Sequence, residues 1–484
     1  MARVNINQKV AVSVVYVAAM FMTIMDTTIV NVALPTLGRQ FGVAPDAVDT
    51  VAIGFLVSLA VFIPVSGWLG DKLGERRVLL GAIALFTLAS ALCGLATSLG
   101  ELVAFRVLQG VAGGLMTPVG MAMLFRTFPP AERVRASSIL TVPTAFAPAI
   151  GPVLGGLLVT DLTWRWVFYV NVPLGVLAVV FGGLFLAEQP RTGAGRFDIG
   201  GFVLSGIGFG ALMYGVSEGP IKGWGTPDVL ASMVAGAVLI VAMVVFELSK
   251  SAPLLDLRLF RDKLFRTASL VTLLSGIGFL GMLFTLALFY QDGLGMTALG
   301  SGLSTFPEAV GVMLSVQVVT KRVYARLGPG PLMAAGLVWV AAAVSLMTLV
   351  GVGTNLWWMR GLVFCMGAGM ACVFVPAQAV AFATVGKAST GNASTIYNAL
   401  RQLGSAVGVG LLTTVVAAVG PIRHAHGRVV PHLAAYHGAF LLAAAFALAA
   451  AGVGLTVGRR DPNAVTSEAG TDGPAQPVPV AEAG

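Results

Sequence analysis

Long apolar stretches separated by short polar loops dominate the chain between residues 10 and 457. An α-helix needs about 20 mostly apolar residues to cross the hydrocarbon core of a bilayer. Fourteen stretches meet that requirement, and each is expected to form a membrane-spanning helix. Their predicted bounds are 10–32, 47–70, 78–98, 101–124, 136–159, 165–186, 199–217, 227–248, 267–290, 299–320, 331–351, 356–382, 391–418 and 434–457.

The charged residues predict how these helices are oriented. Lys and Arg gather in the loops that share a side with the N-terminus, while the opposite loops hold few of them. Loops rich in Lys and Arg stay in the cytoplasm. Because the number of spans is even, both ends of this multi-pass plasma-membrane protein are expected to be cytoplasmic.

Composition excludes several other classes of protein. The chain is 57% hydrophobic and 10% charged, whereas soluble domains carry about 25% charged residues. Its net charge of +8 comes from loop residues rather than from a basic face with aromatics, so nucleic acid is not an expected partner. The sequence shows no phosphate-binding loop, no metal cluster and no nucleophilic constellation in the spans. No enzymatic activity, cofactor or metal is therefore expected.

A weak internal repeat indicates how the domains are organised. The loop 67–77 after the second span has a degraded echo at 321–328, after the tenth span. Two parallel six-helix halves with substrate bound between them are one known transporter plan. The expected division is a cytoplasmic N-terminus (1–9), an N-terminal six-helix half (10–186), a linker with two inserted spans (187–266), a C-terminal six-helix half (267–457) and a disordered cytoplasmic tail (458–484).

Asp26 interrupts the first apolar span, where a charge costs about 2.5–3.5 kcal/mol on insertion scales. By helical rise, Asp26 lies about 24 Å above the inner end of its span, and Arg106 about 8 Å below the outer end of its own. In a core about 30 Å thick the two share a depth. We expect a proton-coupling pair in which Arg106 holds Asp26 ionised until substrate or a structural change separates them. The alternatives are a static ion pair, or a carboxylate that lies among headgroups or only pins two helices.

Glu308 is a second carboxylate inside a span, about 14 Å into the tenth and close to the midplane. Burial favours the neutral form of a carboxyl group, so Glu308 is a candidate for proton coupling or for binding a cationic substrate. The alternative is a protonated acid that is hydrogen-bonded at a helix interface.

Other polar residues in the spans are candidates for lining a substrate cavity. Asn398 and Arg401 are three residues apart in the thirteenth span and share one face, which points toward a cavity or toward a partner helix. Gln402 and, in the first span, Asn31 complete the predicted set. The thirteenth span contains no acid.

Two further segments have compositions suited to conformational change. In the loop after the second span, glycines permit a tight turn, and Asp71 can pair with a cation or cap a helix to lock one conformation. In the fifth span, prolines and small residues favour a kinked, closely packed helix suited to a gate. The residues concerned are Gly67, Asp71, Gly74, Arg76 and Arg77 in the loop, and Pro148, Gly151, Pro152, Gly155 and Gly156 in the span.

These segments resemble the motifs of the major facilitator superfamily, and in particular of its fourteen-span drug:proton antiporters. The most specific match is Trp164–Gly175, similar to the pattern W-R-W-x-F-x-x-N-x-P-x-G. Met25 and Ala147 depart from the Leu and Gly that the family usually has. The other matches are 26–35 to D-x-T-I-V-N-V-A-L-P, 67–77 to G-x-L-a-D-r-x-G-r-r, 105–114 to the fourth-span motif, 147–156 to G-x-x-x-G-P-x-x-G-G, and 398–408 to N-x-x-R-Q-x-G-x-x-x-G.

The resemblance implies an all-α major facilitator fold with two six-helix halves plus two inserted helices. It implies a monomeric multidrug efflux protein that exports hydrophobic, cationic or neutral drugs or antibiotics in exchange for protons. A dedicated exporter of one natural product, siderophore or lipid shares the same motifs and is the alternative. A membrane-embedded enzyme or scaffold is a further alternative, which no motif favours.

Four histidines, His424, His426, His432 and His437, lie in or beside the last outer loop. Histidines there can sense pH or bind metal, but their irregular spacing favours solvated loop residues.

Overall fold

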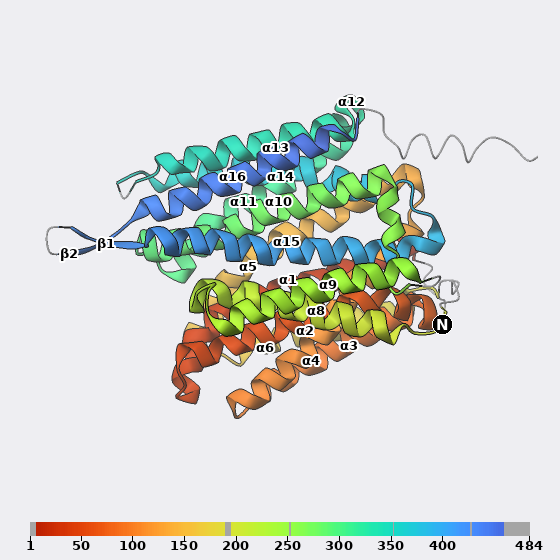
Figure 1. The fold of residues 1–484 in the computed structure, drawn as a ribbon, viewed down its shortest axis with the longest axis horizontal. Helices are drawn as coiled ribbons and strands as arrows, with labels where there is room; N and C mark the ends of the chain where they lie inside the picture. The colour runs from red at the N-terminus through yellow and green to blue at the C-terminus, as the bar shows by residue number, and fades with distance from the viewer. Residues whose placement is uncertain (1–5, 189–194, 251–252, 352, 426–427, 459–484) are drawn as a thin grey trace, which may run out of the picture.

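The computed structural model describes residues 6–188, 195–250, 253–351, 353–425 and 428–458. Fourteen helical segments in these ranges are long and apolar enough to cross a membrane, as predicted. They lie side by side along a common direction (Figure 1). The helices are α1 (Gln8–Phe41), α2 (Pro45–Leu73), α3 (Glu75–Leu95), α4 (Leu99–Thr127), α5 (Arg133–Asp161), α6 (Trp166–Tyr169), α7 (Asn171–Phe185), α8 (Ile199–Lys222), α9 (Pro227–Ser249), α10 (Lys263–Leu288), α11 (Ala298–Val318), α12 (Tyr324–Leu327), α13 (Pro329–Leu346), α14 (Leu356–Ala381), α15 (Thr390–Val419) and α16 (Leu433–Leu455).

Residues in the short loops set where the helices begin and end. The Asn7 side chain accepts the backbone N–H of Lys9 at the start of α1, and Gly42 ends that helix with a φ of 64°. Ser98 caps α4 in the same way. Such caps satisfy backbone groups that a helix end leaves unpaired. Most helices therefore stop within a few residues of the predicted spans, whereas α1 continues to Phe41, well beyond the predicted end at 32.

The first six spans and the last six have the same arrangement of neighbours. In the first group α1 packs on α5 and α7, and α4 packs on α2 and α3. In the second group α10 packs on α15 and α16, and α14 packs on α11 and α13. One apolar core lies entirely within the second group, whereas the core of the first group extends onto residues of the second, such as Phe265, Phe382 and Tyr397. The two groups meet through α5 against α11 and α14, and through α15 against α2 and α4.

The two inserted helices attach to one side of the bundle. Helix α8 contacts both α2 and α15, so it touches both six-helix groups. Helix α9 packs on α8 and exposes most of its apolar side chains, such as Leu230, Val241 and Val245. In Figure 1 the pair lies across the front of the bundle.

Two local features differ from the apolar pattern. The predicted span 165–186 is divided into α6 and α7, which meet at Val170. The loop between α15 and α16 contains a hairpin of β1 (Ile422–Ala425) and β2 (Arg428–Pro431), with Ile422 opposite Pro431. The hairpin projects from the end of the bundle opposite the N-terminus (Figure 1). The predicted disordered tail lies, from residue 459 onward, outside the described residues.

Candidate functional site

Asp26 is completely buried where α1, α4 and α7 meet. Its Oδ2 forms an ion pair with Nη1 of Arg106. Its Oδ1 accepts hydrogen bonds from Gln109 Nε2 at 2.9 Å and from Asn171 Nδ2 at 3.1 Å. The structure therefore brings together the two charges that the sequence placed at one depth, and adds two amide donors.

Arg106 is held as tightly as the carboxylate that it binds. Its Nη1 also donates to Gln109 Oε1 at 2.8 Å, and its Nε donates to the Val51 carbonyl at 3.3 Å. The guanidinium carbon lies 4.2 Å from the centroid of the Phe55 ring, a cation–π distance. Removing one partner of a buried ion pair costs about 3–5 kcal/mol, because the other charge stays buried and unpaired. We call Asp26, Arg106, Gln109 and Asn171 the Asp26 cluster.

Gln109 and Asn171 were not among the predicted site residues. Both lie inside segments that the sequence had singled out, 105–114 and 164–175, and both are amides in otherwise apolar surroundings. Asn171 is the first residue of α7, and its Nδ2 also lies 3.2 Å from Ser90 Oγ on α3. The break between α6 and α7 thus brings an amide to the carboxylate.

The cluster links proton binding to helix packing. An ionised carboxylate accepts all three donors, whereas a protonated one loses the charge that attracts the guanidinium. The donors come from α4 and α7, while the carboxylate comes from α1. A proton on Asp26 therefore weakens the polar contacts between α1 and those two helices.

Glu308 lies on the interior face of α11. At 100° per residue, the exposed Leu303 and Leu314 point to the opposite side of this helix. Glu308 is 1% exposed, and its backbone packs on Gly367 of α14. Its Oε1 has no hydrogen-bond partner among the described residues. A buried acid with an unused acceptor is free to hold a proton or to receive a donor from a ligand.

Asn398 and Arg401 lie together where α15 meets α4. Asn398 is buried, and its Nδ2 contacts the Met121 sulfur at 3.3 Å and donates to the Ser394 carbonyl at 2.9 Å. Its Oδ1 accepts a hydrogen bond from Arg401 Nη2 at 3.3 Å. The face shared by these two residues is directed at a partner helix of the other six-helix group.

The remaining predicted cavity residues, Asn31 and Gln402, take no part in these contacts. Asn31 is exposed on α1, and Gln402 is half-buried on α15. Neither side chain has a hydrogen-bond partner among the described residues. Their predicted contact with substrate stays a prediction.

Asp71 contributes to a charged contact between the two groups at the end of the bundle that carries the N-terminus. Arg126 at the end of α4 pairs with Asp71 Oδ1 and with Glu75 Oε1, both at 2.8 Å. Its Nε donates to the Lys387 carbonyl, which lies just before α15, at 3.0 Å. We call Asp71, Glu75, Arg126 and Lys387 the latch.

Gly67 permits a close approach of α2 and α15 beside the latch. A Cβ at this position would lie 2.8 Å from Thr395 Oγ1 and 3.2 Å from the backbone of Gly391. The neighbouring Ser66 hydroxyl lies 3.1 Å from the same Thr395 hydroxyl. Any larger residue at Gly67 would force the two groups apart.

The other residues of the loop have local partners. Gly74 connects α2 and α3 with a φ of 96°, in the left-handed region that favours glycine. Arg76 donates to the Gly183 carbonyl at 2.7 Å, and Arg77 pairs with Glu188 at 2.8 Å. These two arginines hold the end of α7 rather than the opposite group.

Further contacts close the same end of the bundle. The rings of Phe125 on α4 and Phe382 after α14 are stacked with centroids 4.2 Å apart. Arg133 at the start of α5 donates through Nη1 to the carbonyls of Phe382 and Ala383, the latter at 2.8 Å. The two groups are therefore in direct contact at this end.

Helix α5 packs closely on α1 through its small residues. A Cβ at Gly151 would lie 2.0 Å from Thr28 Oγ1, and one at Gly155 would lie 3.0 Å from the Ile29 carbonyl. Both glycines therefore face α1 just after Asp26.

The rest of the fifth-span motif has other surroundings. Pro152 lies beside Gly302 of α11, where an added Cβ would be 3.3 Å away, so α5 contacts both groups. Pro148 is half-buried, and nothing would meet a Cβ at Gly156 within 4 Å. In this motif Gly151 and Gly155 therefore contact α1, Pro152 contacts α11, and Gly156 contacts neither helix.

Comparison with known proteins identifies the family. The profile of the Major Facilitator Superfamily matches residues 16–409. The chain belongs to the major facilitator superfamily. A chain of Bacillus subtilis (strain 168) described as an uncharacterized MFS-type transporter, YhcA, is 30% identical over 411 residues, which are 85% of this chain and 77% of that protein.

Other relatives of this superfamily member have names that refer to drug resistance. The Multidrug resistance protein B homolog of Mycobacterium tuberculosis (strain ATCC 25618 / H37Rv) is 31% identical over 408 residues, 83% of this chain and 75% of that protein. The Putative multidrug resistance protein MdtD of Serratia proteamaculans (strain 568) is 31% identical over 422 residues, 87% of both chains. These names support the narrower placement in the drug:proton antiporter family of the superfamily.

A solved structure has the same fold. The human organic anion transporter MFSD10 (TETRAN) superposes with a TM-score of 0.66 at 17% identity, covering 92% of this chain and 99% of that one. The all-α major facilitator fold predicted from the sequence is confirmed, with the small hairpin as an addition.

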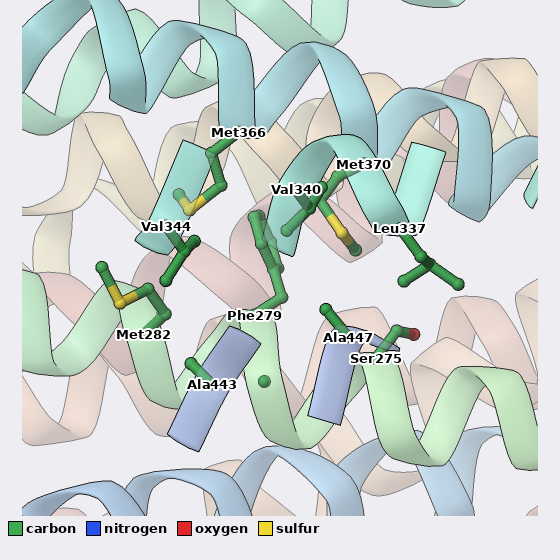
Figure 2. A pocket seen from close by; sticks show the side chains of 11 residues that line it. Ser275, Phe279, Met282, Leu337, Val340, Val344, Met366, Met370, Ala443 and Ala447 are labelled. Carbon is green, nitrogen blue, oxygen red and sulfur yellow. The ribbon is translucent and has the colours of Figure 1, made fainter. Parts of the chain in front are cut away.

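Neither of two hollows in the described part of this superfamily member contains the Asp26 cluster or Glu308. One is an apolar void of about 10 Å³ among α10, α13, α14 and α16, whose lining includes Phe279, Met282, Met366 and Met370 (Figure 2). That volume is at the lower limit for a single water, so it is a packing defect. The other is a groove of about 400 Å³ between α11 and α14, lined by Leu303, Phe306, Pro307, Val310, Trp357, Arg360 and Phe364.

Two of the four histidines have described side chains. Nδ1 of His432 lies 3.0 Å from the Gly420 carbonyl, and Nε2 of His437 lies 3.1 Å from the Val350 carbonyl. His426 lies outside the described residues. The His432 contact ties the loop before α16 to the end of α15, and the His437 contact ties α16 to the loop after α13.

Proposed function

We propose that this chain is a proton-coupled antiporter that exports hydrophobic drugs or antibiotics across the plasma membrane by alternating access. The observation that carries the proposal is the completely buried Asp26–Arg106 pair between α1 and α4. Relatives named multidrug resistance proteins support the substrate class. The chain ends lie in the cytoplasm in this proposal, so the latch closes the cytoplasmic side.

A proton on Asp26 is the first step of the proposed cycle. The neutral carboxyl group attracts Arg106 less, so α1 separates from α4 and α7 more easily. Release of the proton restores the charge and the three donor contacts. Proton binding and substrate binding are coupled because they favour different arrangements of the same helices.

In the proposed cycle the latch must also open before the cytoplasmic side becomes accessible. Opening the cytoplasmic side breaks the contact of Arg126 with the Lys387 carbonyl and separates the stacked Phe125 and Phe382 rings. Arg126 keeps its two carboxylates, Asp71 and Glu75, because all three belong to the N-terminal group. The latch therefore opens without leaving a buried charge unpaired. Glu308 serves in the proposal as a second proton or substrate site.

Everted membrane vesicles test the coupling. An imposed pH gradient should drive ethidium uptake in wild-type vesicles, and collapse of the gradient should abolish it. Asp26→Asn should lose gradient-driven uptake and retain downhill exchange, because the amide cannot exchange a proton at neutral pH. Asp161→Asn, at the exposed end of α5, is the matched control and should behave as wild type. Full gradient-driven uptake by Asp26→Asn would refute the proposal.

The breadth of export requires a separate measurement. Resistance and accumulation across a panel of chemically unrelated compounds separate a multidrug exporter from the alternative, an exporter of one natural product, siderophore or lipid. Protection against several scaffolds is expected. Protection confined to one scaffold would favour the alternative while leaving proton coupling intact.

A further inference from the structure

Arg401 is a positive charge near the middle of the membrane that no carboxylate of the described residues neutralises. It lies 11 residues into α15, which by helical rise is about 16 Å from the start of that helix. Asn398 Oδ1 is its hydrogen-bond partner, and its buried Nε has none. Arg106, by contrast, has a carboxylate, an amide and a carbonyl. A charge kept at this depth without a counter-ion indicates that another molecule supplies one.

A second unpartnered donor lies nearby, in the other six-helix group. Tyr16 on α1 is completely buried, its ring packs on Gly120 of α4, and its hydroxyl has no hydrogen-bond partner among the described residues. Gly120 precedes Met121, whose sulfur contacts Asn398, the hydrogen-bond partner of Arg401, so Tyr16 lies close to Arg401. The Tyr397 hydroxyl is already hydrogen-bonded to Thr272, at 2.8 Å. Tyr16 Oη and Arg401 Nε are therefore the unused donors.

We propose that Arg401 and Tyr16 bind the anionic group of an amphiphilic aromatic or aliphatic acid, such as a carboxylate or sulfonate. The proposal rests on the function proposed above, because it names the substrate class of the same exporter. An oxygen anion accepts from both donors, and charge-assisted hydrogen bonds of this kind are the stronger ones. The anionic class adds to the cationic or neutral compounds that the sequence suggested.

The position of the two donors gives the anion a role in the cycle. Tyr16 belongs to the N-terminal group and Arg401 to the C-terminal group, and the Asn398–Met121 contact shows that the groups touch here. An anion that bridges the donors holds the two groups together at the midplane. Asp26 is bonded to Arg106 elsewhere in the N-terminal group, so proton and anion have separate sites.

Binding of two matched probes tests the site. The full-length protein in lipid nanodiscs is titrated with naphthalene-1-sulfonate and with trimethyl(1-naphthyl)ammonium, aromatic ions of similar size and opposite charge. Wild type should bind the sulfonate more tightly. Arg401→Gln should weaken sulfonate affinity about tenfold or more, and Arg401→Lys should lose less. Equal sulfonate affinity in wild type and Arg401→Gln, or tighter wild-type binding of the ammonium ion, would overturn the proposal.

Two further variants keep the test informative. Tyr16→Phe removes one oxygen and preserves the packed ring, so it tests the site even if Arg401→Gln does not fold. We expect a several-fold loss of sulfonate affinity in this variant. An unchanged sulfonate affinity would contradict the site. Arg360→Gln, in the separate groove between α11 and α14, is the matched arginine control and should bind like wild type. Sulfonate binding without gradient-driven uptake would refute the proposed function alone, whereas gradient-driven ethidium uptake without Arg401-dependent sulfonate binding would refute this site alone.

Discussion

Asn171→Ala removes one hydrogen-bond donor from the buried Asp26 carboxylate and leaves the Arg106 ion pair in place. A hydrogen bond to a charged group is worth about 1.5–3 kcal/mol. The Asn171 side chain connects α7 to α1 through this bond, so its removal should lower the free energy of unfolding by about 1.5–3 kcal/mol. The midpoint of thermal unfolding should therefore fall in this variant.

Thermal unfolding of the purified full-length proteins measures this change. The unfolding midpoint is recorded for wild type and Asn171→Ala under the same conditions. Gln291→Ala is the control, because among the described residues the Gln291 side chain bonds only to the Ala287 carbonyl, one turn earlier. An unchanged midpoint in Asn171→Ala, or an equal fall in both variants, would refute the stabilising role of Asn171.

Two further outcomes follow from the packing and the latch. Gly151→Ala places a Cβ about 2 Å from a threonine hydroxyl of α1 and should abolish transport, whereas Gly156→Ala meets nothing within 4 Å and should transport normally; equal transport by the two variants in vesicles would contradict the close packing. Arg126→Gln leaves Asp71 and Glu75 close together without their cation, and should destabilise the protein by about 3–5 kcal/mol, seen as a lower midpoint of thermal unfolding. An unchanged midpoint would show that the latch charges are well solvated.

The spans were predictable because length and apolar content alone decide whether a helix crosses a bilayer. The depth of a residue followed from helical rise, which is why Asp26 and Arg106 were matched correctly. The direction of a side chain around its helix did not follow. Lipid and protein interior are both apolar, so the sequence of α11 did not show on which side Glu308 lies. The alternating exposure of its neighbours in the structure shows it.

Contacts between residues far apart in the chain also could not be predicted from the sequence. Asn171 reaches Asp26 only because the sixth span breaks before it, and the length and apolar content that predict a span do not locate such a break. Arg126 binds Asp71 and Glu75 across a turn whose geometry depends on Gly74. The hairpin after α15 lies in a loop, where no apolar length constrains the structure. Tyr16 was missed because an aromatic residue in an apolar span is usually only a packing residue.

The attachment of α8 to both six-helix groups makes the two junctions between the groups structurally different. On the α2 side, Gly206 and Gly210 of α8 lie against Val61. On the α15 side, Val216 of α8 lies against Gly410, and Trp224, just after α8, donates to Thr414 at 2.7 Å. No inserted helix spans the opposite junction of α5 and α11 in the described residues. Any change in the angle between the groups must move α8 with them or slide α8 along α2 at its two glycines. The groups are therefore bridged by a helix on one side of the bundle and are free of such a bridge on the other.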